Sequence, residues 1–308
     1  MRALRNRRDV VKLGALAVGA GLMPRLLAQA LADLDVASAG AMKQMLDGPL
    51  KTAAAEALKL NLRSHSQGAD AVAKALVDGT LQADVFLPIT AGPMRTVMQA
   101  RKATIAEPLA STEMVITYSP KSKFAAQFAA AAKGKANLWE VLQQPGLKFV
   151  RSSPAGDPGG RNIIFVTMLA AKKYGQPDLV EKVLGATLNP EQILSGGNNQ
   201  ARMLSGELDA GGSYRSSAAS SGMPYIVLPE DINLSGLNVR RDHPDVSLTV
   251  EDKTFYPEPL VFYAGVLKGA ANPKGAEDFV RWLKSDPTQG LFRANQFAPA
   301  GGAAELNA

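Results

Sequence analysis

The fold is indicated by the stretch Leu34-Asp35-Val36-Ala37-Ser38-Ala39-Gly40-Ala41. It predicts a strand at Asp35–Ala39 that ends in a turn of small and hydroxyl residues. A helical pattern follows from Met42 to Lys59, with a break at Gly48-Pro49. A strand, a short turn and a helix in this order are typical of α/β folds, so we expect an α/β protein.

The same alternation of short apolar runs and helical patterns continues along the chain. Further strands are predicted at Leu60–Arg63, Asp84–Leu87, Met114–Tyr118, Lys148–Arg151, Leu208–Gly212, Tyr225–Leu228 and Leu260–Val266. Further helices are predicted at Ala71–Val77, Lys123–Ala132, Ile163–Tyr174, Gln200–Ser205 and Pro273–Leu283. This pattern predicts mostly parallel sheets flanked by helices. The tail, residues 298–308, is rich in Ala and Gly, and we expect it to fray.

Two extended segments predict the places where the chain crosses between domains. They are Val115–Pro120 and Phe255–Tyr263. A chain that leaves one α/β domain, builds a second and returns makes two lobes joined by a two-strand hinge, with the ligand in the cleft between them. The predicted parts are residues 33–117 as the first part of lobe 1, residues 118–254 as lobe 2, and residues 255–308 as the return segment of lobe 1 with the C-terminal tail.

An export leader is predicted at the N-terminus from Asn6-Arg7-Arg8-Asp9-Val10-Val11-Lys12, which is followed by an apolar run from Leu13 to Met23. This is the pattern of a twin-arginine signal peptide, and small residues favour cleavage before Leu31 or Asp33. A membrane anchor is the alternative, but the apolar run is shorter than the roughly 20 residues that span a bilayer. We therefore predict a signal peptide at residues 1–32 and a mature protein that is soluble in the periplasm.

The formal net charge of +6 belongs mostly to the leader. Residues 1–30 hold six Lys or Arg and one Asp, which leaves about +1 on the rest of the chain. Without a basic stripe, and with aromatic residues at only 6%, the composition excludes a nucleic-acid partner. The chain has no cysteine, so it has no disulfide framework, no thiolate metal site and no lipidated cysteine.

Four turns of small, hydroxyl or amide residues open helices and are candidate anion sites. Such a turn leaves backbone N–H groups free and directs the positive end of a helix toward a ligand. Asp157-Pro158 is also typical of an ordinary helix start, Ser38 and Ser66 are compatible with helix caps, and Gly196-Gly197 with a plain loop. Their shared placement at the carboxyl ends of strands favours a common binding site. The four turns are Ser38–Ala41, Ser64–Gly68, Asp157–Asn162 and Ser195–Asn199.

The sequence features of an enzyme are weak. The chain has two histidines, His65 and His243, which are far apart, and it lacks a glycine-rich phosphate loop and a G-x-S-x-G nucleophile elbow. His65 is more typical of an exposed or capping residue than of a ligand. The competing class is a twin-arginine-exported enzyme that loads its cofactor in the cytoplasm. We expect no enzyme, no cofactor and no metal.

A set of landmarks between residues 33 and 297 carries a family resemblance. They are Val36–Gly40, Asp47–Leu50, Ala83–Phe86, Asp157–Arg161, Gly206–Tyr214, Leu228–Ser235 and Asn272–Ala276. With them the chain resembles the periplasmic solute-binding proteins of ABC importers, nearest to the molybdate/tungstate-binding group. The resemblance implies the two-lobed type II periplasmic binding protein fold, a monomer, an ABC permease as partner and a molybdate/tungstate-like oxyanion as ligand. A small organic acid or another solute is the alternative ligand.

The resemblance also implies which residues hold the ligand. In this family a serine at each of the first two strand-to-helix turns, backbone N–H groups of the second lobe and a tyrosine bind the oxyanion. Tyr214 matches the tyrosine, and Gly197 and Gly160-Arg161 fall near the backbone donors. The tungstate-type branch adds two carboxylates to the metal's coordination. Asp157 matches one of them, whereas Ser213 stands at the position of the other.

The first two turns depart from the family pattern. The serine of the first turn aligns with Ala41, and Ser38 is the nearest hydroxyl. At the second turn the nearest hydroxyl is Ser66, next to Gln67. The candidate ligand contacts are therefore Ser38, Ala41, Ser66, Gln67, Asp157, Gly160, Arg161, Gly197 and Tyr214.

Overall fold

The computed structural model describes residues 30–194 and 199–308. The chain separates into two units, Met1–Ala30 and Leu31–Ala308, and the fold described below is that of the second. Nearly all of the predicted leader, and the candidate residue Gly197, lie outside the described residues. Within the described ranges, no helix combines the length and the apolarity needed to cross a membrane.

The first sheet is built around strand β1 (Ala32–Ala39), which is parallel to both of its neighbours, β2 and β3. The order of the sheet is β12-β4-β11-β3-β1-β2, with β13 alongside β4. β11 is antiparallel to β3 and β4, and β12 and β13 are antiparallel to β4. The other strands are β2 (Leu60–Gln67), β3 (Val85–Leu87), β4 (Ile105–Ser111), β11 (Val261–Val266), β12 (Ala298–Pro299) and β13 (Leu306–Asn307).

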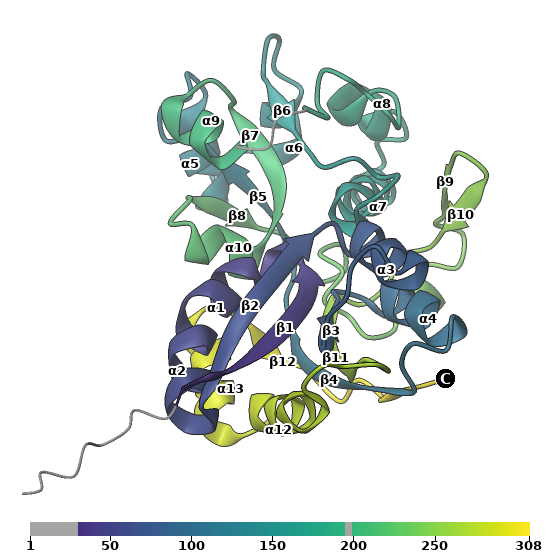
Figure 1. Cartoon of the computed structure of the whole chain (residues 1–308). Helices are drawn as coiled ribbons and strands as arrows, with labels where there is room; N and C mark the ends of the chain where they lie inside the picture. The colour runs from purple at the N-terminus through teal and green to yellow at the C-terminus, as the bar shows by residue number, and fades with distance from the viewer. Residues whose placement is uncertain (1–29, 195–198) are drawn as a thin grey trace, which may run out of the picture. The chain divides into compact units, whose positions relative to one another are not determined.

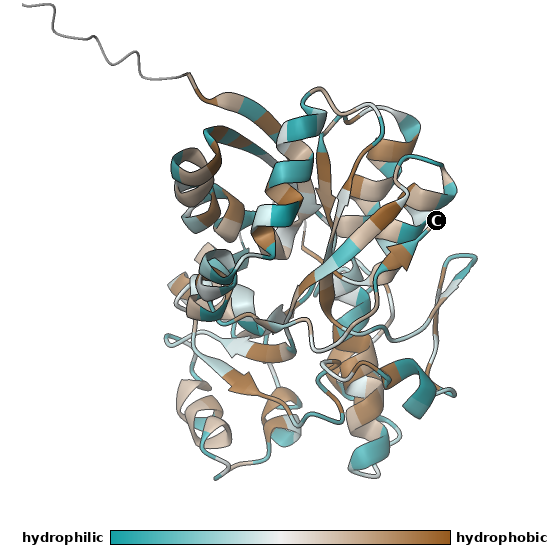
Figure 2. Cartoon of the chain, turned by 90° about the horizontal axis from the view of Figure 1, so that it is seen from below, coloured by the Kyte–Doolittle hydropathy of each residue, from teal (hydrophilic) through white to brown (hydrophobic). Residues whose placement is uncertain are grey.

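Helices cover both faces of this sheet because its central strands are apolar on both sides. In β1, Val36 packs into a core with α1, α2, α12 and α13, and the next residue, Ala37, packs into a separate core with α3 and α4. Figure 1 shows α1 and α2 beside β1 and β2, with α3 and α4 on the other side. These helices are α1 (Lys43–Asp47), α2 (Pro49–Leu58), α3 (Ala69–Asp78), α4 (Ala91–Gln99), α12 (Pro273–Leu283) and α13 (Asp286–Ala294). Figure 2 shows hydrophobic residues on the strands and alternating hydrophobic and hydrophilic residues along the helices, as two-sided burial requires.

The second sheet has the order β6-β7-β5-β8, in which only the pair β6 and β7 is parallel. The chain reaches this sheet from β4 through Thr112 and Glu113. Its strands are β5 (Met114–Tyr118), β6 (Phe149–Val150), β7 (Ala210–Tyr214) and β8 (Tyr225–Val227). Around them lie α5 (Ala125–Ala132), α6 (Leu138–Leu142), α7 (Pro158–Lys173), α8 (Leu179–Leu184), α9 (Asn199–Ser205), α10 (Arg215–Ser220) and α11 (Val239–Asp242), and a hairpin of β9 (Leu248–Val250) and β10 (Lys253–Phe255).

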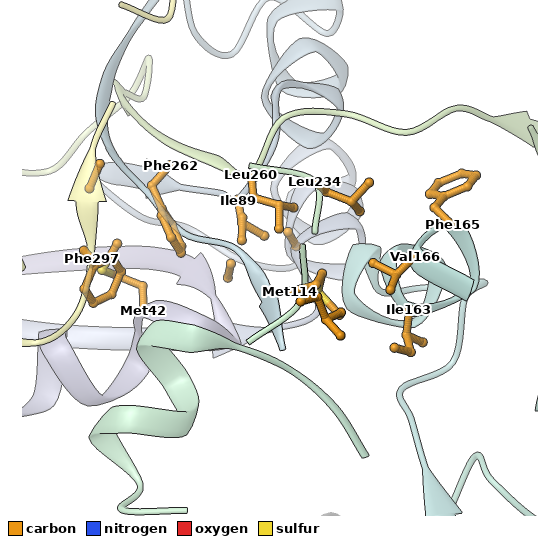
Figure 3. Close-up of a cluster of buried hydrophobic side chains, with 14 of the residues drawn as sticks. Met42, Ile89, Met114, Ile163, Phe165, Val166, Leu234, Leu260, Phe262 and Phe297 are labelled. Carbon is orange, nitrogen blue, oxygen red and sulfur yellow. The ribbon is translucent and has the colours of Figure 1, made fainter. Parts of the chain in front are cut away.

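One continuous apolar core connects the two sheets. Figure 3 shows Phe262 of the first sheet, Met114 of the second, and Ile163 and Val166 of α7 in the same cluster. Met114 and Phe262 are almost completely buried. Phe262 also contacts Phe297, with 5.4 Å between the ring centroids. Since this core lies beneath the start of α7, it fixes the position of that helix relative to the first sheet.

The α/β fold is confirmed, but one part of that prediction is wrong. The sheets are mixed rather than mostly parallel, because β4 carries the chain toward the second sheet and β11 brings it back, so the two strands run in opposite directions. β4 was not predicted at all. Glu107 and Pro108 interrupt its apolar pattern, although its backbone pairs with β11 along most of its length.

Two local predictions are also wrong. β2 extends to Gln67, so the predicted turn at Ser64–Gly68 is mostly strand. The tail does not fray: β12 and β13 both pair with β4, and Leu306 is 7% exposed. The Ala- and Gly-rich composition was misleading because backbone groups, which every residue has, make these pairings.

We predict that Leu306→Ala lowers the free energy of unfolding by about 2 kcal/mol, the low end for a buried leucine, because β13 is a short edge strand. Urea denaturation followed by circular dichroism measures the change. The matched control is Glu305→Ala, an exposed neighbour whose loss should leave the midpoint unchanged. If the two variants have the same midpoint, the burial of Leu306 does not stabilise the fold.

Candidate functional site

A cavity of about 230 Å³ lies where the carboxyl ends of β1 and β2 meet the start of α7 and the end of β7. The carboxyl ends of neighbouring parallel strands form the edge at which α/β sheets bind ligands. We call it the Tyr214 cavity. Its polar side chains and backbone donors come from Gly40, Ala41, Gln67, Gly68, Ser152, Asp157, Gly159, Gly212, Ser213, Tyr214 and Ser217, with Ala39, Ile89 and Met114 completing the wall.

The hydroxyl of Tyr214 is held from behind by α7. It accepts a hydrogen bond from Asn162 Nδ2 at 3.1 Å, and Asn162 is 3% exposed. Burial raises the pKa of Tyr214, and the nearby Asp157 raises it further, so the phenol keeps its proton. None of the described residues accepts that proton in a hydrogen bond. The O–H group is therefore free to donate to an acceptor in the cavity.

Asp157 caps the helix that supplies Asn162. Its Oδ1 accepts a hydrogen bond from the Gly159 N–H at 2.9 Å, and Pro158 is the first residue of α7. The ordinary helix start predicted from Asp157-Pro158 is thus confirmed. Burial raises the pKa of the Asp157 carboxyl, while the hydrogen bonds from Gly159 and Ser152 oppose that rise. Asp157 is also the one charged side chain among the described residues that line the Tyr214 cavity.

Ser38 and Ser66 lie next to each other, as expected from their places at the ends of two neighbouring strands, but neither reaches the cavity. They are partners in the parallel register of β1 and β2, and their Oγ atoms are 2.6 Å apart. Ser38 is fully buried, and neither serine lines the cavity or caps a helix. Gln67, one residue beyond Ser66, does line it, as does Ala41 in the first turn after β1.

Gly160 and Arg161 face away from the Tyr214 cavity. The Gly160 N–H donates to the Asp157 carbonyl at 3.1 Å, and a Cβ at this position would lie 2.3 Å from the carbonyl oxygen of Ser152. Arg161 Nη1 donates to the Pro154 carbonyl at 2.8 Å, and its Nη2 forms an ion pair with Asp70 of α3. Both residues therefore fix the loop before α7 against its surroundings, and neither lines the cavity.

A second cavity, of about 290 Å³, adjoins the first, and we call it the Arg151 cavity. The two share a strip of wall made of Gly40, Ala41, Ser152, Gly212, Ser213 and Ser217. Beyond this strip the Arg151 cavity is lined by Arg151 after β6, by Lys43 and Gln44 of α1, and by residues of α9. The shared wall makes the two cavities neighbouring parts of one cleft.

The candidate contacts did not include Ser217 and Arg151, which line the cleft, or Asn162, which holds the Tyr214 hydroxyl from behind. Ser217 follows Tyr214 by three residues in α10, and a hydroxyl just after the matched tyrosine was a signal that could have been used. Asn162 lies one residue beyond Arg161, on the side of α7 that faces Tyr214. Arg151 ends a predicted strand, but nothing in its local sequence distinguishes it from a surface arginine.

The arrangement offers hydrogen-bond donors rather than a catalytic set. His65 lies in β2 with Nε2 3.2 Å from Asp35 Oδ1, and neither residue lines the cleft. Over the described ranges, no three His, Asp or Glu side chains cluster closely enough to hold a metal ion. Among the described residues, the Tyr214 cavity provides a free phenol O–H, serine hydroxyls and the backbone N–H groups of the turn after β1.

Comparison with known proteins agrees with the family that the sequence resembles. The sequence profile described as bacterial extracellular solute-binding protein matches residues 34–298. The molybdate/tungstate-binding protein WtpA of Pyrococcus abyssi is 31% identical over 60% of this chain and 59% of its own length. The protein of the same description from Thermococcus kodakarensis is 28% identical, with 60% and 58% covered. The chain thus spans about three fifths of the length of the curated relatives that it matches.

Solved structures agree on the fold. The periplasmic molybdate-binding protein of Azotobacter vinelandii superposes with a TM-score of 0.61 at 18% identity, covering 86% of this chain and 98% of that one. The sulfate-binding protein SubI of Mycobacterium tuberculosis gives a TM-score of 0.60 at 12% identity, with 88% of each chain covered. The predicted two-lobed fold of type II periplasmic binding proteins is confirmed.

The Arg161–Asp70 pair, which holds the loop before α7, gives a test of this geometry. We predict that Asp70→Ala lowers the free energy of unfolding by about 3 kcal/mol, because it breaks the ion pair of the buried Arg161 guanidinium. The matched control is Asp78→Ala in the same helix, which removes only the exposed partner of Lys74 and should have no measurable effect. Urea denaturation of both variants distinguishes them, and equal midpoints would contradict the proposed role of the pair.

Proposed function

Because the chain belongs to the family of bacterial extracellular solute-binding proteins, we propose that it is the periplasmic substrate-binding component of an ABC transporter. The twin-arginine leader would deliver it to the periplasm, and it would then act as a soluble monomer that hands its ligand to a permease in the inner membrane. Its work is binding and release, so no residue is assigned a catalytic role.

The ligand in this proposal is a small anion of the molybdate/tungstate type, bound in the Tyr214 cavity. The observation that carries it is the Tyr214 O–H, which is oriented by Asn162 and has no acceptor among the described residues, in a cavity that also holds the backbone N–H groups of the turn after β1. Donors that converge with no basic side chain are suited to an oxyanion. The descriptions of the two archaeal relatives support this ligand class.

We divide the candidate residues by proposed task. We propose Ala41, Gln67 and Tyr214 as direct contacts, with Asp157 at the same cavity. The hydroxyl pair of Ser38 and Ser66 would hold the two strand ends together. Gly160 and Arg161 would position the start of α7, and Gly197 stays a sequence-based candidate.

Closure of two lobes around the ligand completes the proposal. Lobe 1 would comprise residues 33–117 and 255–308, and lobe 2 residues 118–254. The Tyr214 cavity takes residues from both parts: Gln67 from the first and Asp157 from the second. A ligand that contacts both lobes binds the closed state more tightly, and this differential affinity shifts the population toward closure.

Loss of one hydroxyl tests the assignment of Tyr214. We predict that Tyr214→Phe weakens molybdate, tungstate or sulfate binding by about ten-fold, the value of one hydrogen bond to a charged group. Isothermal titration calorimetry measures the affinity. Tyr118→Phe, which changes a tyrosine stacked on Phe128 outside the cleft, is the matched control and should bind as the wild type does. Unchanged affinity of Tyr214→Phe would refute the assignment.

The pH dependence of binding tests the part played by Asp157. Its pKa is raised by burial, so the carboxyl is neutral at low pH and becomes an anion as the pH rises through that pKa. We predict that sulfate affinity falls as the pH rises through this pKa, which lies above the usual aspartate value of 3.8, because the two anions then repel each other. Asp157→Asn keeps the helix cap and should remove the dependence.

A rise of affinity with increasing pH would indicate a different role for Asp157. If ionised Asp157 completes the coordination of a metal centre, Asp157→Asn weakens tungstate binding and affinity rises with pH. Calorimetric titration with sulfate and tungstate at several pH values separates the two outcomes, since sulfate has no metal centre to coordinate.

A further inference from the structure

The Arg151 cavity has a charge that the Tyr214 cavity lacks. Among the described residues, the charged side chains that line it are Lys43 and Arg151, and no acidic side chain does so. Lys43 is exposed at the mouth, where it pairs with Asp47 on the next turn of α1. Arg151 is 3% exposed and lies in the wall. Because Asp47 pairs with Lys43, Arg151 carries the unpaired positive charge among the described residues that line this cavity.

Arg151 is a buried cation that has no acidic partner among residues 30–194 and 199–308. Its Nε donates to Gln192 Oε1 at 2.9 Å and its Nη2 to the Ala186 carbonyl at 2.8 Å, both of them neutral acceptors. Nη1 is buried and has no hydrogen-bond partner in the described part of the chain. Burial alone lowers the pKa of Arg151, with no acidic neighbour to oppose it. Burying an unpaired charge is costly, so such a group points to a partner supplied by a ligand.

The lining that the two cavities share leaves room for a ligand that extends into both. It consists of small residues and hydroxyls, including Ser152, Ser213 and Ser217, with no large side chain between them. Asn199 Oδ1, which lines the Arg151 cavity, is a second buried polar atom with no partner in the residues that the structure describes. A tetrahedral oxyanion has only five heavy atoms, and the two adjoining cavities, of about 230 and about 290 Å³, leave room for a larger ligand.

We propose that the Arg151 cavity is a second anion subsite, through which the protein also binds small organic acids with two anionic groups, such as phosphono- or phospho-carboxylic acids. The inference rests on the proposed function: one group occupies the Tyr214 cavity as an oxyanion would, and the other meets Arg151 and Lys43. The ligand is bound through both ends, so neither group alone reaches the full affinity.

The test compares two ligands that differ in one charge. Purified protein is titrated in a calorimeter with phosphonoacetate, which carries a phosphonate and a carboxylate, and with methylphosphonate, which lacks the carboxylate. We expect phosphonoacetate to bind at least ten-fold more tightly, because the carboxylate gains a charge-assisted hydrogen bond from Arg151. Arg151→Met should abolish this advantage and leave the affinity for methylphosphonate unchanged. Arg281→Met, an exposed arginine on α12, is the matched control and should retain the advantage.

The outcomes distinguish failure of the second subsite from failure of the proposed function. Equal affinity of the two ligands for the wild type, or an advantage that persists in Arg151→Met, overturns the subsite while the proposed function stands. If molybdate, tungstate, sulfate and both phosphonates all fail to bind, the proposed function itself fails. If Arg151→Met does not fold, as judged by circular dichroism, Lys43→Met replaces it. Lys43 is exposed, and its replacement should still weaken phosphonoacetate binding at least three-fold without weakening methylphosphonate binding. If phosphonoacetate affinity does not change, the subsite is overturned.

Discussion

The parallel register of β1 and β2 is the constraint on which the rest of the cleft depends. It sets Ser38 opposite Ser66 and Ala39 opposite Gln67, so that two strands distant from α7 in the sequence end at the same level. The hydrogen bond between Ser38 and the half-buried Ser66 satisfies the fully buried Ser38 hydroxyl, which would otherwise be costly to bury. A slip of one residue would turn Ser38 and Val36 to the opposite face and disrupt the core.

The second half of the cleft is built by one helix start and one strand end. Asp157 caps α7, and the helix then presents Asn162 to the Tyr214 hydroxyl at the end of β7. Hydrogen bonds to charged groups contribute about 1.5–3 kcal/mol each. Several such donors converging on one anion are therefore enough for micromolar to nanomolar affinity, about −8 to −12 kcal/mol. The charged groups lie at separate ends, with Asp157 in the Tyr214 cavity and Arg151 in its neighbour, which would orient an asymmetric ligand.

Local signals in the sequence were sufficient for much of this structure. The strand at Met114–Tyr118 and the cap at Asp157 depend on neighbouring residues, and both were predicted. What could not be predicted depends on distant residues. Arg161 was a candidate donor to the ligand, but its Asp70 partner is 91 positions away in the chain. Strand β4 contains a proline and is identified only by the strands that pair with it. Arg151 stands out only when the structure shows its burial and its lack of an acidic partner.

A crystal structure of the protein grown with tungstate would test the central claim most directly, because the anomalous scattering of tungsten locates the ion without ambiguity. The account predicts one strong peak in the Tyr214 cavity, with a tungstate oxygen within hydrogen-bond distance of the Tyr214 hydroxyl and of the turn after β1. Peaks confined to surface lysines and arginines, with that cavity empty at saturating tungstate, would contradict it.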